Sequence, residues 1–233
     1  MNNPSLLHQP VGAIAAMDFR TAPLLSRAGI DFCCGGKMTL SEACLQNGIN
    51  PSELQQSLFE ALESPLNKSA VYKEWPIGFL CDYITHVHHT YVRSVLPDLL
   101  TFTQKIASVH GEHHPELIGI AGCMENINDE MVQHMKMEEE VLFPAIKSLA
   151  VKKEPTLKET IQSEIRRMLT EHDYVGNASD DIMKVTHNYF EPEDACSTYR
   201  TALKLLKEFG EDLHIHVHLE NNILFPRALA LES

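Results

Sequence analysis

The sequence has few aromatic residues, few basic residues and no long apolar run. Aromatic residues make up 7% of 233 residues, and 19 Lys and Arg stand against 32 Asp and Glu, for a formal net charge of -13. Because the basic residues are few and scattered, neither nucleic acid nor an anionic membrane is an expected partner. No apolar run approaches the roughly 18 residues of a membrane span, and the N-terminus lacks the layout of a secretory signal. We therefore expect a cytoplasmic protein.

Cysteine is too scarce for a disulfide scaffold, with six residues in the whole chain. Such scaffolds belong to short secreted domains, whereas the reducing cytosol keeps thiols free. Four of the six show no pairing motif and are predicted to be packed thiols without a role: Cys44, Cys81, Cys123 and Cys196. The adjacent pair that remains needs a separate explanation.

Strand-like alternation is also missing, and the patterns that are present are helical. Four long segments carry helical periodicity, at about 76–109, 116–149, 156–188 and 194–229, with short Pro-containing connections between them. Short connections force antiparallel neighbours, and helices of about 30 residues would be about 45 Å long. The sequence therefore predicts an all-α fold built around an up-down-up-down four-helix bundle.

A small helical domain is expected before the bundle. Thr39 and Asn50 each precede a Glu by three residues, which is the spacing of a helix N-cap, and Pro51 suits the first position of a helix. The polar stretch at 63–69 contains Pro and has no periodicity, so it is the expected linker. We assign 1–68 to the N-terminal domain and 69–233 to the bundle.

The strongest signal is a repeat in the second and fourth segments. His134-x-x-x-Glu138 and His216-x-x-x-Glu220 are each followed, after two residues, by Val or Ile and then Leu-Phe-Pro. Residues four apart share a helix face, so each copy points one imidazole and one carboxylate in the same direction. Bundle proteins with two iron ions commonly draw such sets from two helices and complete them from the other two.

The other two segments offer histidines at matching heights. His89, His134, His172 and His216 are separated by 45, 38 and 44 residues, so each step covers about one helix and a turn. His172 is the only interior histidine of its segment, whereas the first segment leaves three candidates open: His86, His88 and His89. A lone histidine on a helix is usually an ordinary surface or core residue, and this interpretation is kept for His113, His114, His214 and His218.

Imidazole and carboxylate ligands without thiolate favour iron or manganese over the sulfur-rich structural zinc sites, although zinc can intrude. We expect two irons with bridging carboxylates.

Taken together, the motifs resemble the repair-of-iron-centres family, which joins a Cys-Cys-Gly-Gly domain to a hemerythrin-like di-iron bundle. The resemblance covers nearly the whole chain and is carried by four motifs: Asp31-Phe-Cys-Cys-Gly-Gly-Lys37, His134-Met-Lys-Met-Glu138, Glu171-His-Asp173, and the segment from His216 to Leu229. It implies two non-haem iron ions, which an oxo or hydroxo group can bridge.

The resemblance also implies the ligands. They would be His89, His134, His172 and His216, with Glu138 and Glu220 bridging the metals and His86 as the fallback for His89. Oxygen-carrying hemerythrins usually place another histidine one turn after the third-helix ligand, where this chain has Gly176. The iron nearest His172 should therefore keep a labile position, which favours reactivity or iron delivery over oxygen transport. Glu130 and Glu171 are expected to hydrogen-bond the ligands or to line an exit path for cations; the alternative is a solvated helix face.

Cys33 and Cys34 are predicted to do transient chemistry. Adjacent cysteines close only a strained disulfide that is easy to reduce. If Lys37 or a helix N-terminus lies close, the thiolate would be favoured and could capture a metal or nitric oxide. The alternative is two small buried residues at a tight turn.

Three functions remain open. The leading hypothesis, implied by the resemblance, is repair of iron-sulfur clusters damaged by nitric oxide or oxidants, with iron donated to damaged or apo iron-sulfur proteins and Cys33 and Cys34 as a thiol relay. The second is an enzyme, a nitric oxide reductase that produces nitrous oxide. The third is a module that binds or senses oxygen or nitric oxide. A homodimer is left open.

Overall fold

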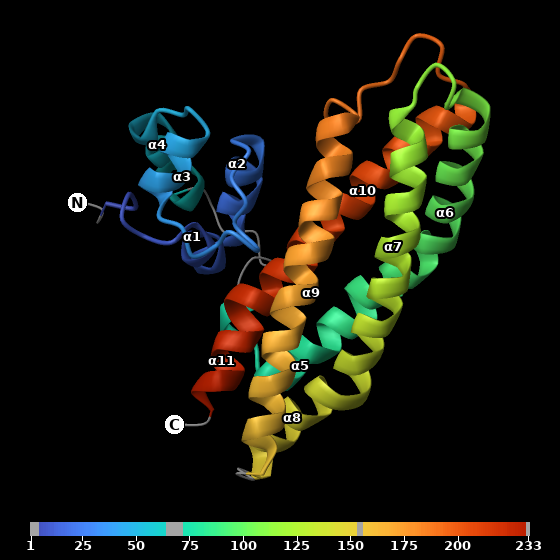
Figure 1. The fold of residues 1–233 in the computed structure, drawn as a ribbon. Coiled ribbons are helices and arrows are strands. Elements are labelled where there is room, and N and C mark those ends of the chain that lie inside the picture. Colours follow the sequence, from blue (N-terminus) through green and yellow to red (C-terminus); the bar gives the residue numbers. More distant parts are fainter. Residues whose placement is uncertain (1–4, 64–71, 153–155, 232–233) are drawn as a thin grey trace. The chain divides into compact units, whose positions relative to one another are not determined.

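The computed structural model describes residues 5–63, 72–152 and 156–231, and within them the regular elements are helices (Figure 1). The predicted all-α fold is confirmed. Contacts divide the chain into two units, Met1–Leu80 with Val217–Ser233, and Cys81–His216. The domain boundary predicted between residues 68 and 69 falls outside the described residues.

The N-terminal part of the first unit is a set of short helices with its own core. Several side chains from different helices, including Ile14, Leu25, Leu40 and Leu58, are fully buried in one cluster. The elements are α1 (Val11–Met17), η1 (Phe19–Thr21, a 3-10 turn), α2 (Ala22–Arg27), α3 (Leu40–Gln46), α4 (Pro51–Glu63) and η2 (Tyr72–Glu74, a 3-10 turn). This matches the predicted helical mini-domain.

Both predicted helix starts are found. The Thr39 hydroxyl accepts the backbone N–H of Glu42 at 3.3 Å, and the Glu42 carboxylate accepts the Thr39 N–H at 3.0 Å, which makes a capping box. At α4, Asn50 accepts the N–H of Ser52 at 3.0 Å, with Pro51 as the first helical residue. These caps satisfy N–H groups that a helix leaves without intrahelical partners.

Four long helical segments come next along the chain, close to the predicted ranges. Their elements are α5 (Ile77–Tyr83), η3 (Ile84–His89) and α6 (Thr90–His110); α7 (Glu116–Met137), η4 (Glu138–Leu142) and α8 (Phe143–Lys152); α9 (Leu157–Val185); and α10 (Ser197–Leu219), η5 (Glu220–Leu224) and α11 (Phe225–Ala230). None of the described helices is long and apolar enough to cross a membrane.

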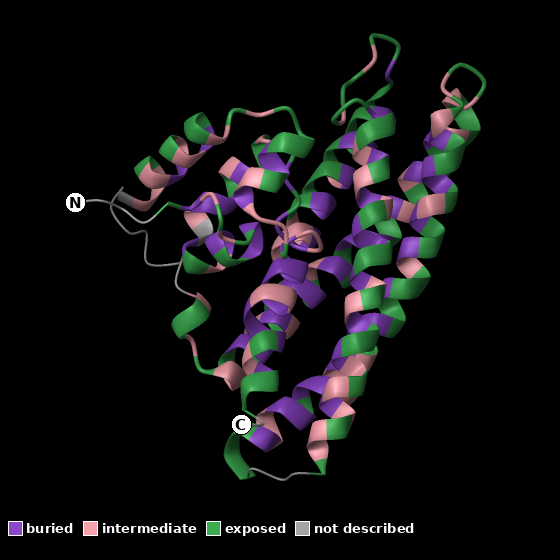
Figure 2. Cartoon of the chain, turned by 60° about the vertical axis from the view of Figure 1, so that its left-hand side comes forward, coloured by how far each residue is buried: buried purple, intermediate pink, exposed green. Residues whose placement is uncertain are grey.

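Within the second unit, α6, α7, α9 and α10 lie side by side (Figure 1). Helix α6 packs on α7, and α7 packs on α9. Helix α10 approaches α9 closely at Gly210, where an added Cβ would lie 3.1 Å from the hydroxyl of Ser179. Buried and exposed faces alternate along these helices (Figure 2), which is the amphipathic pattern that the periodicity predicted.

Within the described residues three π-helical turns, η3, η4 and η5, interrupt the helices, and the sequence did not reveal them. Two of them start at a glutamate of the repeat and end two residues before a proline, Pro144 or Pro226. A proline ring clashes with the carbonyl four residues earlier in a regular α-helix, and a widened turn relieves this clash. Such turns are frequent at functional sites.

Candidate metal centre

Four buried histidines, one from each long helical segment, come together in the second unit. They are no more than 2% exposed: His89, His134, His172 and His216. The ring centroids of His134 and His172 are 4.7 Å apart, and those of His89 and His216 are 5.0 Å apart. The structure therefore places the four predicted imidazoles in one layer, as two pairs.

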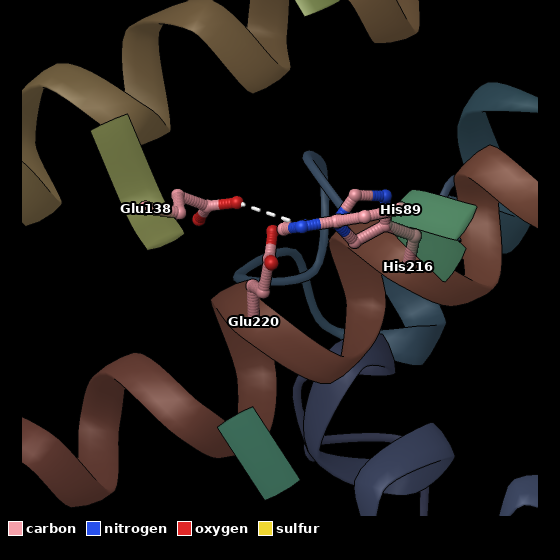
Figure 3. A group of neighbouring side chains, drawn as sticks. All are labelled: His89, Glu138, His216 and Glu220. Atoms are coloured by element: carbon pink, nitrogen blue, oxygen red, sulfur yellow. Dashed lines mark ion pairs between the residues drawn. The ribbon is translucent and has the colours of Figure 1, made fainter. Parts of the chain in front are cut away.

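Two fully buried carboxylates, Glu138 and Glu220, accompany the histidines. One oxygen of Glu138 lies 3.3 Å from Nε2 of both His89 and His134. Glu220 follows His216 by one turn of the same continuous helix. Figure 3 shows both carboxylates turned toward His89 and His216.

The side chains make two overlapping groups in which all ligand atoms lie within 4.8 Å of one another. One group has His89 and His216, the other has His134 and His172, and both contain Glu138 and Glu220. Because the carboxylates belong to both groups, the arrangement has the form of two neighbouring cation sites that share two carboxylates.

Outside this layer, Glu139 holds His89 in place. Its carboxylate accepts the Nδ1–H of His89 at 2.7 Å and a guanidinium N–H of Arg93 at 2.8 Å. Burial acts to raise the pKa of Glu139, but the hydrogen bonds from His89 and Arg93 outweigh it and the pKa is lowered. Arg93 is four residues after His89 on the same helix face, so this spacing was a usable signal that sequence analysis missed.

Glu171 holds His134 in the same way. It accepts the Nδ1–H of His134 at 2.8 Å and the Nε–H of Arg167 at 2.6 Å. Burial again opposes ionisation, and the two hydrogen bonds again leave the pKa of Glu171 lowered. Glu130, which was predicted together with Glu171, is exposed. Its charge makes a small contribution to the raised pKa of Arg167, smaller than those of Glu171 and Glu164.

These outer carboxylates orient the donor atoms of the inner layer. With Nδ1–H given to Glu139 or Glu171, a neutral imidazole turns the lone pair of its Nε2 toward Glu138. Nε2 of His134 also lies 3.1 Å from Nε2 of His172. Electron-pair donors and buried carboxylates that converge in this way are compensated by cations, so the residues fit a site for two metal ions.

The structure separates the three histidines that the first segment left open. His86 is exposed and lies with Nδ1 2.8 Å from the carbonyl of Asp82, outside both groups. His88 is buried, but its Nδ1 lies 2.9 Å from Asp212, and its ring stacks on His216 at 5.5 Å. Only His89 joins the layer.

The Cys-Cys-Gly-Gly loop is organised by Asp31. Its carboxylate accepts the backbone N–H groups of Cys33, Cys34 and Gly35 at 2.8, 3.0 and 2.6 Å. Asp31 and both thiols also form a group within 4.8 Å. A Cβ added at Gly35 would lie 2.9 Å from the carbonyl oxygen of Asp31, so close packing rather than a loose backbone explains this glycine.

The thiolate form of Cys33, which we expected to be favoured if Lys37 lay close, is instead disfavoured by the surroundings of this residue. The thiol lies 3.0 Å from Oδ1 of Asp31 and is buried. The hydrogen bond with Cys34, burial and the charge of Asp31 together raise the pKa of Cys33 well above its usual range. The hydrogen bond with Cys34 and burial are the larger causes, and the nearby carboxylate of Asp31 adds to them.

Within the first unit, Asn222 of η5 links this loop to the C-terminal helix. Its amide lies 3.2 Å from the carbonyl of Phe32 and 3.4 Å from that of Cys33, and it also contacts His218 at 3.2 Å. The ring of Phe32 meets that of His218 edge-on at 5.4 Å. Burial lowers the pKa of His218 to about 4, so this ring packs as a neutral group.

The remaining cysteines differ from prediction in one case. Cys44 and Cys81 are buried and Cys123 is half-buried, as packed thiols should be, but Cys196 is exposed. The prediction was wrong for Cys196 because it precedes α10 rather than lying on a buried helix face.

Comparison with known proteins agrees with this two-part construction. Residues 7–62 match ScdA_N, described as a domain of unknown function (DUF542), and residues 82–228 match the hemerythrin HHE cation-binding domain. The iron-sulfur cluster repair protein YtfE of Yersinia pestis (strain Pestoides F) is 36% identical over 95% of this chain and 97% of its own length. The protein of the same name from Yersinia pseudotuberculosis serotype O:1b (strain IP 31758) is 35% identical over the same shares. The resemblance to the repair-of-iron-centres proteins is thus confirmed, and the chain belongs to that family of hemerythrin-type proteins with an N-terminal ScdA_N domain.

Proposed function

We propose that the chain holds two iron ions and supplies iron for the repair of damaged iron-sulfur clusters. The observation that carries this proposal is the sharing of Glu138 and Glu220 by two groups of buried ligands. In this proposal one iron is bound by His89 and His216 and the other by His134 and His172. The names of the relatives support the repair role.

The donor set supports iron rather than a structural zinc. It contains imidazoles and carboxylates without thiolates, and two histidines with carboxylates at an incompletely filled site suit ferrous iron. Gly176, one turn after His172 on α9, is buried and has no side chain that could donate. The iron near His172 is therefore expected to keep a labile position, which suits release of iron as cargo.

The chain's own residues would hold and release this cargo. Glu139 and Glu171 keep His89 and His134 oriented, and their side chains are 27% and 17% exposed. They are thus the carboxylates that connect the buried ligands to solvent, and a cation leaving the centre can be drawn along them. Cys33 and Cys34 receive the iron or contact the client protein in this proposal, and the reducing cytosol that keeps them as thiols is the proposed compartment.

A second function is supported by the same closeness of the two groups. Two ferrous ions held by shared carboxylates would each offer a position to nitric oxide. Reduction of two nitric oxide molecules by two electrons and two protons would release nitrous oxide and water. This alternative needs both metals at once, whereas iron donation needs only one labile metal. The two functions therefore predict different behaviour in one reaction vessel.

The test uses the full-length protein, loaded with iron and reduced without oxygen. Nitric oxide is added to one sample together with an excess of an electron donor, because two ferrous ions supply electrons for only one nitrous oxide, and nitrous oxide is measured. A second sample is mixed with an apo iron-sulfur protein and iron transfer is measured. Stoichiometric transfer of iron without gas supports donation, and multiple turnovers of gas support the reductase. If protein that carries two irons gave no iron transfer and no nitrous oxide, both functions would be refuted.

A matched pair of variants ties the result to the site. His89→Ala should reduce transfer because it removes a ligand of one of the two proposed irons. His86→Ala changes an exposed histidine three residues earlier, and it should behave as the wild type. Equal losses in the two variants would contradict the proposed ligand set.

A further inference from the structure

A second cluster of titratable side chains in the same unit surrounds Cys196. The thiol is exposed and directly precedes α10, and its sulfur lies 3.2 Å from Nε2 of His110 at the end of α6. The carbonyl of Cys196 accepts the N–H of Arg200 at 3.1 Å, so the residue caps the helix. A cysteine at a helix N-terminus and beside an imidazole has the setting of a reactive thiol.

The electrostatic setting agrees with this geometry. The hydrogen bond with His110, followed by those from the backbone N–H groups of Tyr199 and Thr198, lowers the pKa of Cys196 to about 7. At pH 7 such a thiol is about half ionised, whereas a thiol at the ordinary value of 9 is about 1% ionised. This is the reverse of Cys33, whose pKa is raised by its neighbours.

The charged neighbours of this thiol are held by other partners. Asp194, two residues before it, lies 3.1 Å from Nε2 of His114, and Glu116 lies 3.2 Å from Nδ1 of the same ring. The hydrogen bond to Asp194 is the main cause of the raised pKa of His114. The rings of His110 and Tyr199 lie 5.3 Å apart. Because His114 compensates Asp194, that carboxylate opposes the Cys196 thiolate less than its position suggests.

A shallow, open cavity of about 470 Å³ is lined by residues close in sequence to Cys196 and His110, but not by these two residues themselves. Thr198 is two residues after the cysteine, Ser108 is two residues before the histidine, and both line it. Its other lining residues come from α6: Thr101, Phe102, Gln104 and Lys105. The lining offers hydroxyl groups, an amide, an aromatic ring and one cation, which suits a small polar molecule that carries a carboxylate.

We propose that Cys196 is a modification site that exchanges with carboxylate-bearing low-molecular-weight disulfides, and that the cavity holds the attached half. The Cys196 thiolate attacks one sulfur of the disulfide, a new sulfur–sulfur bond forms, and the original bond breaks. The proton lost from Cys196 passes through His110 to the departing thiolate. The low-molecular-weight disulfide is itself the oxidant in this exchange, so no further oxidant is consumed. The proposal does not rest on the function proposed above.

The first test is peptide-resolved alkylation of the reduced full-length protein by iodoacetamide between pH 5 and 9. Cys196 should react with a midpoint near pH 7. His110→Gln should raise this midpoint by about one unit or more and slow the reaction at pH 7 up to about five-fold, because the loss of thiolate outweighs its greater nucleophilicity. His113→Gln, in the same turn, is the matched control and should match the wild type.

The second test uses glutathione disulfide as the probe. Peptide-resolved mass spectrometry should show an adduct on Cys196, and Lys105→Ala should weaken its formation while leaving the alkylation midpoint unchanged. Circular dichroism and iron content check that the variants are folded. An unchanged midpoint in His110→Gln, or no adduct on Cys196 of the wild type, would overturn the proposal.

Discussion

The His-x-x-x-Glu motif occurs twice, in α7 with η4 and in α10 with η5. The two copies have the same types of ligand residue but differ in the two residues after the glutamate. In both copies the histidine and glutamate are buried, the glutamate starts a π-helical turn, and Leu-Phe-Pro ends the motif. After the glutamate, however, the first copy continues with Glu139-Glu140 and the second with Asn221-Asn222. The shared part builds the proposed metal layer, so the difference must serve something else.

Each copy uses these two residues for a different contact. Glu139 holds a histidine of the layer, His89, whereas Asn222 binds the carbonyls of Phe32 and Cys33 in the Cys-Cys-Gly-Gly loop. One half of the repeat therefore supports the metal ligands, and the other half supports the thiol loop. Ligand positions are thus constrained by the proposed metal layer, while adjacent positions are free to diverge.

The largest effect should come from the shared carboxylates. Glu138→Ala and Glu220→Ala each remove a side chain that belongs to both groups, so each variant should lose both of the proposed irons. His172→Ala removes a side chain from one group only and should retain about one iron per chain. Iron analysis of protein purified after iron-replete growth measures this.

Equal iron contents in Glu138→Ala and Glu220→Ala would mean that the two copies contribute equally to metal binding. If either glutamate variant kept two irons, the shared role of the carboxylates would be wrong. His214→Ala provides the control, since this partly exposed histidine lies outside both groups.

The next effect concerns the carboxylates that hold the imidazoles. Glu171→Gln removes the charge that binds both His134 and Arg167, so metal affinity should fall by about 10- to 100-fold. Glu139→Gln should act similarly through His89. Competition with a chelator measures the affinity. Glu130→Gln, which changes an exposed carboxylate, should leave the metal affinity unchanged within experimental error. A loss of affinity comparable to that of Glu171→Gln would mean that contact with an imidazole is not the reason for the effect of these carboxylates.

Local patterns predicted much of the fold and the inner site, because they depend on spacing along one helix. Thr39 with Glu42 predicted a capping box, and the repeat predicted which faces of two helices would meet. The outer contacts were missed since they join distant segments: Glu139 reaches His89 across 50 residues, and Asn222 reaches Phe32 across 190. The π-helical turns were missed because no residue pattern distinguishes them from an α-helix, although the prolines after two of them give a physical reason for their presence.

A third prediction tests how tightly the second copy packs against the thiol loop. A Cβ at Gly36 would lie 2.7 Å from the carbonyl oxygen of Phe32 and 2.8 Å from the amide oxygen of Asn222. Gly36→Ala should therefore lower the free energy of unfolding by about 2 kcal/mol. Gly119→Ala, in an exposed and open position of α7, should raise it by about 0.5–1 kcal/mol through helix propensity. Denaturant unfolding distinguishes the two, and a stabilising Gly36→Ala would refute this packing.

The smallest effect isolates the divergent residue itself. Asn222→Ala removes the amide that donates to the two loop carbonyls, which should cost about 1 kcal/mol of unfolding free energy because a net hydrogen bond is worth about that much. Iron content should not change, since Asn222 is not one of the grouped ligands. Cys33 and Cys34 should be alkylated faster, because the loop has lost a contact that positions it.

Glu140→Ala is the matched control for Asn222→Ala, because it changes the equivalent position of the first copy, where the side chain is exposed. It should leave alkylation of both loop cysteines unchanged. If the two variants exposed the cysteines equally, the thiol loop would not depend on the second copy in particular, and divergence at this position would lack a structural meaning. If only Asn222→Ala does so, one residue next to a metal-binding motif controls access to thiols about 190 positions away in sequence.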